Sequence, residues 1–200
     1  MEVLFATSNK NKVSEANEVG KKYGIAFTQI HILYPEIRGD FVAEVAKGGA
    51  EYVYGQIKKP LIVEDSGLFI KALNDFPGTY SRFVFDKIGN KGVLKLLEGE
   101  EEREARFISA VAYIDSKNLK RSGLISASGV EETETTIFEG VVEGKITLKE
   151  RGSSGFGYDP IFQPTGYVRT FAEDVRMKNS VSHRKIAFEK LCQWLKPKPD

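Results

Sequence analysis

The residues best suited to chemistry are two adjacent carboxylates, Glu64 and Asp65, which follow the aliphatic residues 61–63. The aliphatic residues predict a short buried strand, and Pro60 just before them is a typical start signal. Carboxylates at the end of a buried strand are unfavourable unless a cation or hydrogen-bond donors compensate them. The pattern therefore indicates a divalent-metal or general-base site, with a solvated turn beginning at Glu64 as the alternative.

A second candidate site lies near the amino terminus, between an expected strand at residues 3–7 and a helix whose apolar residues recur from residue 13 to residue 23. Ser8 and Asn9 are good capping residues, and lysines flank the helix start. Exposed amides at a helix N-terminus beside lysines can bind phosphate, although an ordinary capped surface helix has the same pattern. The glycine-rich pattern of a P-loop is absent.

A third candidate is the glycine-rich segment 150–160, which carries Phe156 and Tyr158 between glycines. Glycine lets the backbone approach a ligand closely or adopt positive φ. Aromatic side chains on such a loop can stack on a flat base, with a contribution of ~1–3 kcal/mol per base. The alternative is a tight loop anchored by two buried rings.

Cationic residues also gather near the carboxyl terminus. Ser182 is expected to cap the last helix, which places His183 and Arg184 in its first turn, with Lys178 nearby. Cations at a helix N-terminus oppose the helix dipole, so they indicate an anionic or oxygen-rich partner. A purely structural histidine is the alternative for His183.

The expected strands and helices that carry these residues indicate an α/β fold with a long twisted mixed sheet and flanking helices. We expect one domain over residues 1–200, with two lobes and an active-site cleft between them, because helices concentrate in the first half and at the carboxyl terminus. The capping-box spacing of Thr170 and Glu173 predicts another helix start. Further strands are expected at residues 25–32, 107–114, 124–128, 134–139 and 140–148, and helical segments at 41–54, 80–84 and 93–97.

Composition excludes several classes of protein. The net charge of +1 provides no overall field for nucleic acid or an anionic membrane. Cys192 is the single cysteine, so no internal disulfide can form, and its place on an apolar helix face predicts a core residue. No signal peptide and no apolar run of about 18 residues is found, which predicts a cytoplasmic protein.

Six motifs in order resemble the inosine triphosphate pyrophosphatase family, also called Ham1-like, over residues 3–195. They are Thr7-Ser8-Asn9 with Lys12, Pro35-Glu36-Ile37, Val63-Glu64-Asp65-Ser66-Gly67-Leu68, Pro77-Gly78-Thr79-Tyr80-Ser81, Gly155-Phe156-Gly157-Tyr158-Asp159-Pro160 and Ser182-His183-Arg184. The resemblance implies hydrolysis of ITP, dITP and XTP to the monophosphate and pyrophosphate, which cleanses the nucleotide pool. It also implies Mg²⁺, with Mn²⁺ as an alternative, and a homodimer.

The resemblance also assigns roles to particular residues. Asp65 matches the proton acceptor and a metal ligand, Glu36 matches the other metal carboxylate, and Glu64 an assisting carboxylate. The implied triphosphate-binding residues are Thr7, Ser8, Asn9, Lys10, Asn11, Lys12 and Lys47, with Ser66 at the substrate edge. The implied base pocket comprises Phe156, Gly157, Tyr158, Asp159, Lys178, His183 and Arg184.

The chain departs from the family pattern at two places. Tyr158 stands where some members carry tryptophan, and Arg176-Met177 precedes Lys178 where acidic residues are common. Two other functions remain open from the sequence. One is a pyrophosphatase for modified or pyrimidine nucleotides, and the other is a nucleotide-binding or RNA-binding module that does not hydrolyse its ligand. The paired carboxylates disfavour RNA, because they repel phosphate unless a metal is bound.

Overall fold

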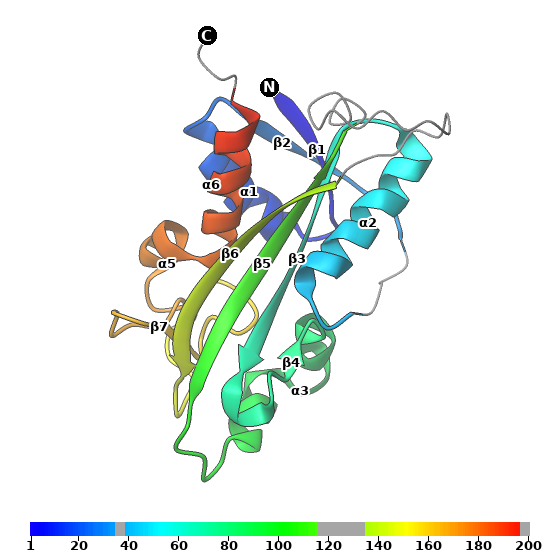
Figure 1. Cartoon of the computed structure of the whole chain (residues 1–200). Coiled ribbons are helices and arrows are strands. Elements are labelled where there is room, and N and C mark those ends of the chain that lie inside the picture. The colour runs from blue at the N-terminus through cyan, green and yellow to red at the C-terminus, as the bar shows by residue number, and fades with distance from the viewer. Residues whose placement is uncertain (35–38, 116–134, 197–200) are drawn as a thin grey trace.

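The computed structural model describes residues 1–34, 39–115 and 135–196, and its core is a seven-stranded sheet (Figure 1). The strands are β1 (Glu2–Ala6), β2 (Ala26–Ile30), β3 (Leu61–Ile70), β4 (Pro77–Gly78), β5 (Glu104–Ile114), β6 (Thr135–Ile146) and β7 (Phe162–Pro164). They lie in the order β2-β1-β3-β5-β6-β7, and β4 pairs with β3. The first three strands are parallel and the later pairs are antiparallel, which confirms the predicted α/β fold with a mixed sheet.

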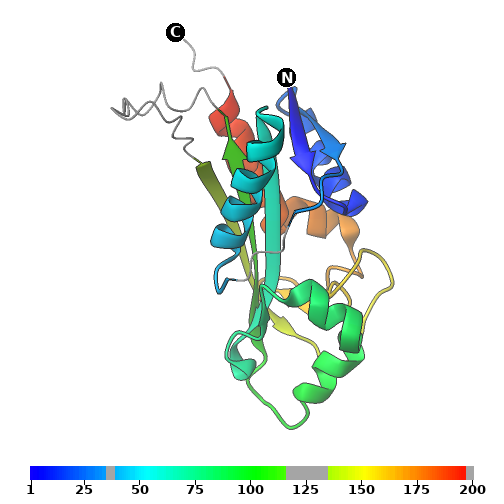
Figure 2. The same cartoon turned by 90° about the vertical axis from the view of Figure 1, so that its right-hand side faces the viewer.

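Helices cover both faces of this sheet (Figure 2). They are α1 (Lys10–Lys21), α2 (Val42–Ile57), the 3-10 helix η1 (Lys71–Leu73), α3 (Ser81–Leu96), α5 (Val175–Val181) and α6 (His183–Leu195). On one face, Phe188 of α6 packs against Phe5 and Phe27, and Cys192 is buried beside them as predicted. On the other face, α2 packs against β3 and β5. No helix in the described ranges is long and apolar enough to cross a membrane.

Two predicted strands are one in the structure. β6 pairs with the whole length of β5, from Glu104 opposite Lys145 to Ile114 opposite Thr135. Gly140 does not break this strand, because it pairs with Ser109 of β5. The first turn of α6 lies directly against Gly140. A Cβ at Gly140 would lie 2.0 Å from the carbonyl oxygen of His183. The glycine therefore allows the close approach that brings α6 onto the sheet.

The predicted helix start at Thr170 is wrong, although its capping hydrogen bonds form. Thr170 N donates to Glu173 Oε2 at 2.8 Å, and Glu173 N donates to Thr170 Oγ1 at 3.3 Å. These bonds close a turn, and the helix begins only at Val175, where Asp174 is the cap. The two helical patterns at 80–84 and 93–97 lie on either side of Gly89, whose φ of +58° and ψ of −166° are not helical, so α3 consists of two helical segments as predicted. The strand expected at 124–128 lies outside the described residues.

Candidate active site

The candidate site is built around a gap in the sheet beside β3. β1 pairs with the first two residues of β3, and β4 pairs with Leu68 and Phe69. Between them, no described strand pairs with this edge at residues 63–67, whereas β5 pairs with the other edge throughout. Glu64 and Asp65 therefore lie in the middle of a ten-residue strand, and the prediction that they follow the end of a short strand is wrong. The strand that ends beside them is β1.

The two adjacent carboxylates face opposite sides of the sheet, because side chains alternate along a strand. Asp65 is paired with Ala110, which belongs to the core cluster under α2. Glu64 is paired with Val111, which belongs to the cluster under α1 and α6. Asp65 is half-buried, whereas Glu64 is only 4% exposed. The sheet thus separates the two carboxylates into different environments.

Glu64 is held by two cations. Its Oε2 lies 2.8 Å from Lys12 Nζ, which also donates to the Glu64 carbonyl oxygen at 3.1 Å. Its Oε1 accepts from Ser109 Oγ at 2.6 Å and from Arg184 Nε at 3.2 Å. Burial alone would raise the pKa of Glu64, but the charges of Arg184 and Lys12 outweigh burial and hold this pKa well below its ordinary value. Glu64 is therefore an ionised carboxylate, with Oε1 hydrogen-bonded to Ser109 and Arg184 and Oε2 in an ion pair with Lys12.

The predicted phosphate-binding segment, residues 7–12, joins β1 to α1. Asn9 caps the helix, because its Oδ1 accepts from the backbone N of Asn11 at 3.0 Å and of Lys12 at 3.4 Å. Thr7 Oγ1 accepts from Asn9 N at 3.1 Å. The exposed residues of the segment are Ser8, Lys10 and Asn11. Through Lys12, this segment brings a capped helix N-terminus to the open edge of β3.

Two other predicted residues are not joined to this group by the described contacts. Lys47 lies on α2 with its side chain 54% exposed, and its Nζ is 3.9 Å from Glu51 Oε1. Glu36 lies outside the described residues. Within the described ranges, no group of three or more His, Cys, Asp and Glu side chains could hold a metal ion.

The carboxyl-terminal part of the chain supplies two buried cations on the same face as Glu64. Arg184 Nη2 donates to Ser66 Oγ at 3.0 Å, and its Nη1 lies 2.6 Å from Glu15 Oε2. Lys178 Nζ lies 2.8 Å from the other oxygen of Glu15. Burial opposes ionisation of Glu15, but Arg184 and Lys178 outweigh it, so the pKa of Glu15 is lowered. Glu15 therefore bridges the two cations.

Glu15 and Ser109 are site residues that sequence reasoning does not identify. Glu15 is three residues beyond Lys12, so both lie on one side of α1, and this spacing is the only local signal. Ser109 lies within an apolar strand, and its contact with Glu64 depends on the register of β3 and β5.

Phe156 lies beside both cations. Its ring centroid is 4.2 Å from Lys178 Nζ and 5.7 Å from Arg184 Cζ, and the residue is half-buried. Asp159 Oδ2 accepts from Phe156 N at 2.8 Å and from Lys178 Nζ at 2.7 Å. Burial raises the pKa of Asp159, although Lys178 opposes this rise. A partly exposed ring beside two cationic donors has the chemistry to bind a flat base that carries oxygen acceptors.

Tyr158 has a different environment from Phe156. It is buried, its hydroxyl donates to the Ser81 carbonyl oxygen at 2.9 Å, and its ring meets the edge of Phe85 at 5.3 Å. The carbonyl oxygen of Gly157 accepts from Asn90 Nδ2 at 3.2 Å. All three partners belong to α3. Tyr158 thus anchors the loop as a buried ring, and direct contact of Tyr158 and Gly157 with substrate stays a prediction.

His183 is a buried neutral side chain. Its ring stacks on Phe107 with centroids 4.6 Å apart and an interplanar angle of 8°. Burial lowers the pKa of His183 well below its ordinary value, and the nearby Arg184 lowers it further. Its Nδ1 has no hydrogen-bond partner among the described residues. Contact with a base remains a prediction for His183.

The loop that carries Phe156 requires glycine at position 155, and this requirement can be tested. This residue has φ +76°, and a Cβ there would lie 2.2 Å from Asp159 Oδ2. Gly157 has φ +63°, but a Cβ at this residue would meet nothing within 4 Å. In both positions, alanine in a left-handed conformation would cost about 1–2 kcal/mol of folding free energy. We expect Gly155→Ala to lower the free energy of unfolding by more than Gly157→Ala, as measured by urea denaturation. Equal losses would contradict the contact with Asp159.

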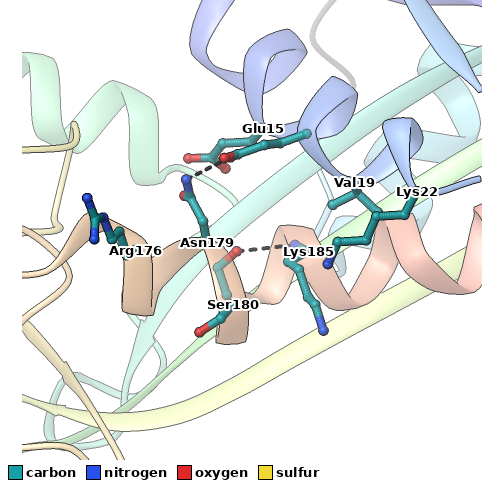
Figure 3. Close-up of a pocket in the computed structure, with 9 residues that line it drawn as sticks. Glu15, Val19, Lys22, Arg176, Asn179, Ser180 and Lys185 are labelled. Carbon is teal, nitrogen blue, oxygen red and sulfur yellow. Dashed lines mark hydrogen bonds between the residues drawn. The ribbon is translucent and has the colours of Figure 1, made fainter.

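A cavity of about 220 Å³, lined mainly by charged and polar residues, lies between α1, α5 and α6 (Figure 3). Glu15 and Glu18 form part of its wall, and Glu18 Oε2 accepts from Asn179 Nδ2 at 2.7 Å. Its lining includes neither Asp65 nor Phe156. Among the described residues, Glu15 is the member of the candidate active site that also lines this cavity, so the cavity is a separate feature.

Comparison with known proteins gives consistent matches over nearly the whole chain. The model of the Ham1 family matches residues 3–194. The chain is 46% identical to a dITP/XTP pyrophosphatase of Methanopyrus kandleri, over 98% of this chain and 97% of that protein. It is 43% identical to one of Thermococcus kodakarensis, over 98% of each. A Ham1 protein structure from Coxiella burnetii has a TM-score of 0.78 and 32% identity, with 98% of both chains covered. The Staphylococcus aureus Ham1 protein has a TM-score of 0.77 and 27% identity, again with 98% of both chains covered.

Proposed function

The chain belongs to the Ham1 family, and we propose that it hydrolyses dITP, XTP and ITP to the nucleoside monophosphate and pyrophosphate. Relatives named dITP/XTP pyrophosphatases support an enzyme that acts on nucleoside triphosphates. One structural observation carries the proposal for this chain. Lys178 and Arg184 both lie beside the ring of Phe156, and Arg184 shares the Glu64 carboxylate with Lys12. Glu64 therefore links Lys12 of the predicted triphosphate segment to Arg184 of the predicted base pocket.

The residues present are compatible with Mg²⁺, or with Mn²⁺. Mg²⁺ is commonly bound by one or two carboxylates together with phosphate oxygens of the substrate. Glu64 is engaged by Lys12 and Arg184, so Asp65 is the carboxylate of this pair that suits a metal. We propose that Asp65 and Glu36 would hold the ion with the triphosphate. When bound, the ion would offset the negative charge of the triphosphate and polarise the α-phosphorus.

The chain's own residues would carry out the remaining steps. Asp65 accepts a proton from the water that attacks the α-phosphorus. The water oxygen forms a bond to this phosphorus while the bond from the phosphorus to the bridging oxygen breaks, and pyrophosphate leaves. Lys12, with the amides at the N-terminus of α1, stabilises the charge that develops on the leaving group. Lys47 is proposed as a further phosphate ligand.

The proposed selectivity depends on donors at the base pocket. Lys178 and Arg184 would donate to the 6-keto oxygen of hypoxanthine or xanthine, while Phe156 stacks on the ring. Adenine carries an amino group at this position, so the N–H groups of Lys178 and Arg184 that do not bind the carboxylates would find no acceptor on the base, at about 1–3 kcal/mol for an unpaired donor. Guanine shares the keto oxygen, so discrimination against GTP requires contacts at the 2-position.

A panel of substrates tests this function. We expect pyrophosphate release from dITP, XTP and ITP at a kcat/KM at least about tenfold above that for ATP, since one unpaired donor has this effect. Excess EDTA should abolish release, and added Mg²⁺ should restore it. A preference for dTTP or UTP would favour the alternative enzyme. Nucleotide binding without release would favour the non-hydrolytic module.

Three further expectations come from the sequence and the family resemblance. They are a homodimer, a single domain of two lobes over residues 1–200, and a cytoplasmic location without a nucleic-acid or membrane partner. These remain predictions for this chain.

A further inference from the structure

Six charged side chains form a continuous row across the candidate site, which we call the ion-pair row. Successive members of the row are in direct contact, and positive and negative charges alternate along it. The members, in order, are Lys12, Glu64, Arg184, Glu15, Lys178 and Asp159. Every side chain in the row is at most 17% exposed. Its first member belongs to the predicted triphosphate segment, and its last members belong to the predicted base pocket.

Glu64 is the link between these two regions. Its Oε2 contacts Lys12 and its Oε1 contacts Arg184, so the two cations share one negative charge. Ser109 Oγ donates to the same Oε1 at 2.6 Å, which restricts the orientation of the carboxylate. The contact of each cation with Glu64 therefore depends on the other, because both share one buried negative charge.

A phosphate group near Lys12 would change this balance. Lys12 would share its charge with the phosphate, and the charge of Glu64 would then be compensated chiefly by Arg184. Arg184 is already fixed on its other side by Glu15 and Ser66. A stronger contact with Glu64 would restrict the guanidinium further, next to the ring of Phe156.

We propose that Glu64 is a positioning residue that couples phosphate binding to base recognition through the ion-pair row. This inference rests on the proposed function, because it takes the locations of the two ligand regions from it. Glu15 extends the coupling to Lys178. Binding of phosphate at one end should therefore strengthen binding of the base at the other, and the effect must be reciprocal.

The coupling can be measured with two separate small molecules, one for the base pocket and one for the phosphate region. We would determine the Kd of 2′-deoxyinosine by calorimetry, with and without saturating pyrophosphate, in the presence of Mg²⁺. In the wild type, pyrophosphate is expected to tighten deoxyinosine binding about fivefold or more, within the usual range of coupling between sites. In Glu64→Gln this ratio is expected to fall to about one. A purely structural role would lower the melting temperature and leave the ratio unchanged.

Two further variants keep the test decisive. Glu189→Gln removes the anion of the Lys185–Glu189 pair, which lies on α6 like Arg184 but outside the row, and should keep the wild-type ratio. If Glu64→Gln does not fold, Glu15→Gln breaks the row at its other carboxylate and should also remove the coupling. A ratio of one in the wild type, or an unchanged ratio in the variant of Glu64 or Glu15 that folds, would overturn the inference. Wild-type hydrolysis of dITP in the same preparation reports separately on the proposed function.

Discussion

Asp65→Asn is expected to lower kcat for XTP by about a thousandfold, within the range for loss of a general base. The substitution is nearly isosteric but removes the proton acceptor and a charge that suits a metal ion. Asp65 lies on the α2 face of β3, whereas the ion-pair row lies on the opposite face. The base pocket should therefore stay intact, and XTP binding should still be detectable by calorimetry while pyrophosphate release is lost.

A surface carboxylate provides the matched control for this variant. Asp86 on α3 has a half-exposed side chain and pairs with Arg82. Asp86→Asn should keep wild-type turnover, because no ion pair or hydrogen bond of the described residues joins Asp86 to Asp65 or to the ion-pair row. Retention of more than about a tenth of kcat by Asp65→Asn would remove Asp65 from its role, since a general base contributes at least about 100-fold.

Arg184→Met is expected to lower the free energy of unfolding by about 3–5 kcal/mol, the usual loss when one partner of a buried ion pair is removed. Arg184 is 2% exposed and contacts both Glu64 and Glu15. Methionine fills part of the space but leaves the charges of both carboxylates less compensated. Urea denaturation would measure the loss, and kcat/KM for XTP should fall as well because a donor to the base is removed.

The exposed ion pair on α3 tests whether burial causes the large loss of stability expected for Arg184→Met. Arg82 pairs with Asp86 four residues later, and its side chain is 78% exposed. Arg82→Met should lower the free energy of unfolding by less than about 1 kcal/mol, because water already screens this pair. Similar losses for Arg82→Met and Arg184→Met would contradict a special role for the buried row.

Local signals in the sequence were enough to predict much of the architecture. The strand at 107–114 is predictable from its apolar residues, and the last helix from the cap at Ser182, whose Oγ accepts from Lys185 N at 3.2 Å. The family motifs predicted that Phe156 and Arg184 belong to one pocket, and the two side chains do contact each other. The strand and the helix cap are determined by residues close together in the sequence, and the motif residues are identified by their types and order.

Other features could not be predicted because they depend on how distant segments meet. Glu64 and Asp65 resemble residues at a strand end, but β3 continues because β5 pairs with it over ten residues. The open edge beside them arises where β1 ends, which the local sequence of β3 does not encode. Similarly, Glu15 becomes a site residue only when Lys178 and Arg184 pack against α1.

A crystal structure of Asp65→Asn with XTP and Mg²⁺ would test the proposed binding mode most directly. The predicted result places xanthine against the ring of Phe156, with its 6-keto oxygen about 3 Å from a nitrogen of Lys178 or Arg184. The triphosphate should extend along residues 7–12 toward position 65. Xanthine bound away from Phe156, for example in the cavity between α1, α5 and α6, would contradict the proposed site.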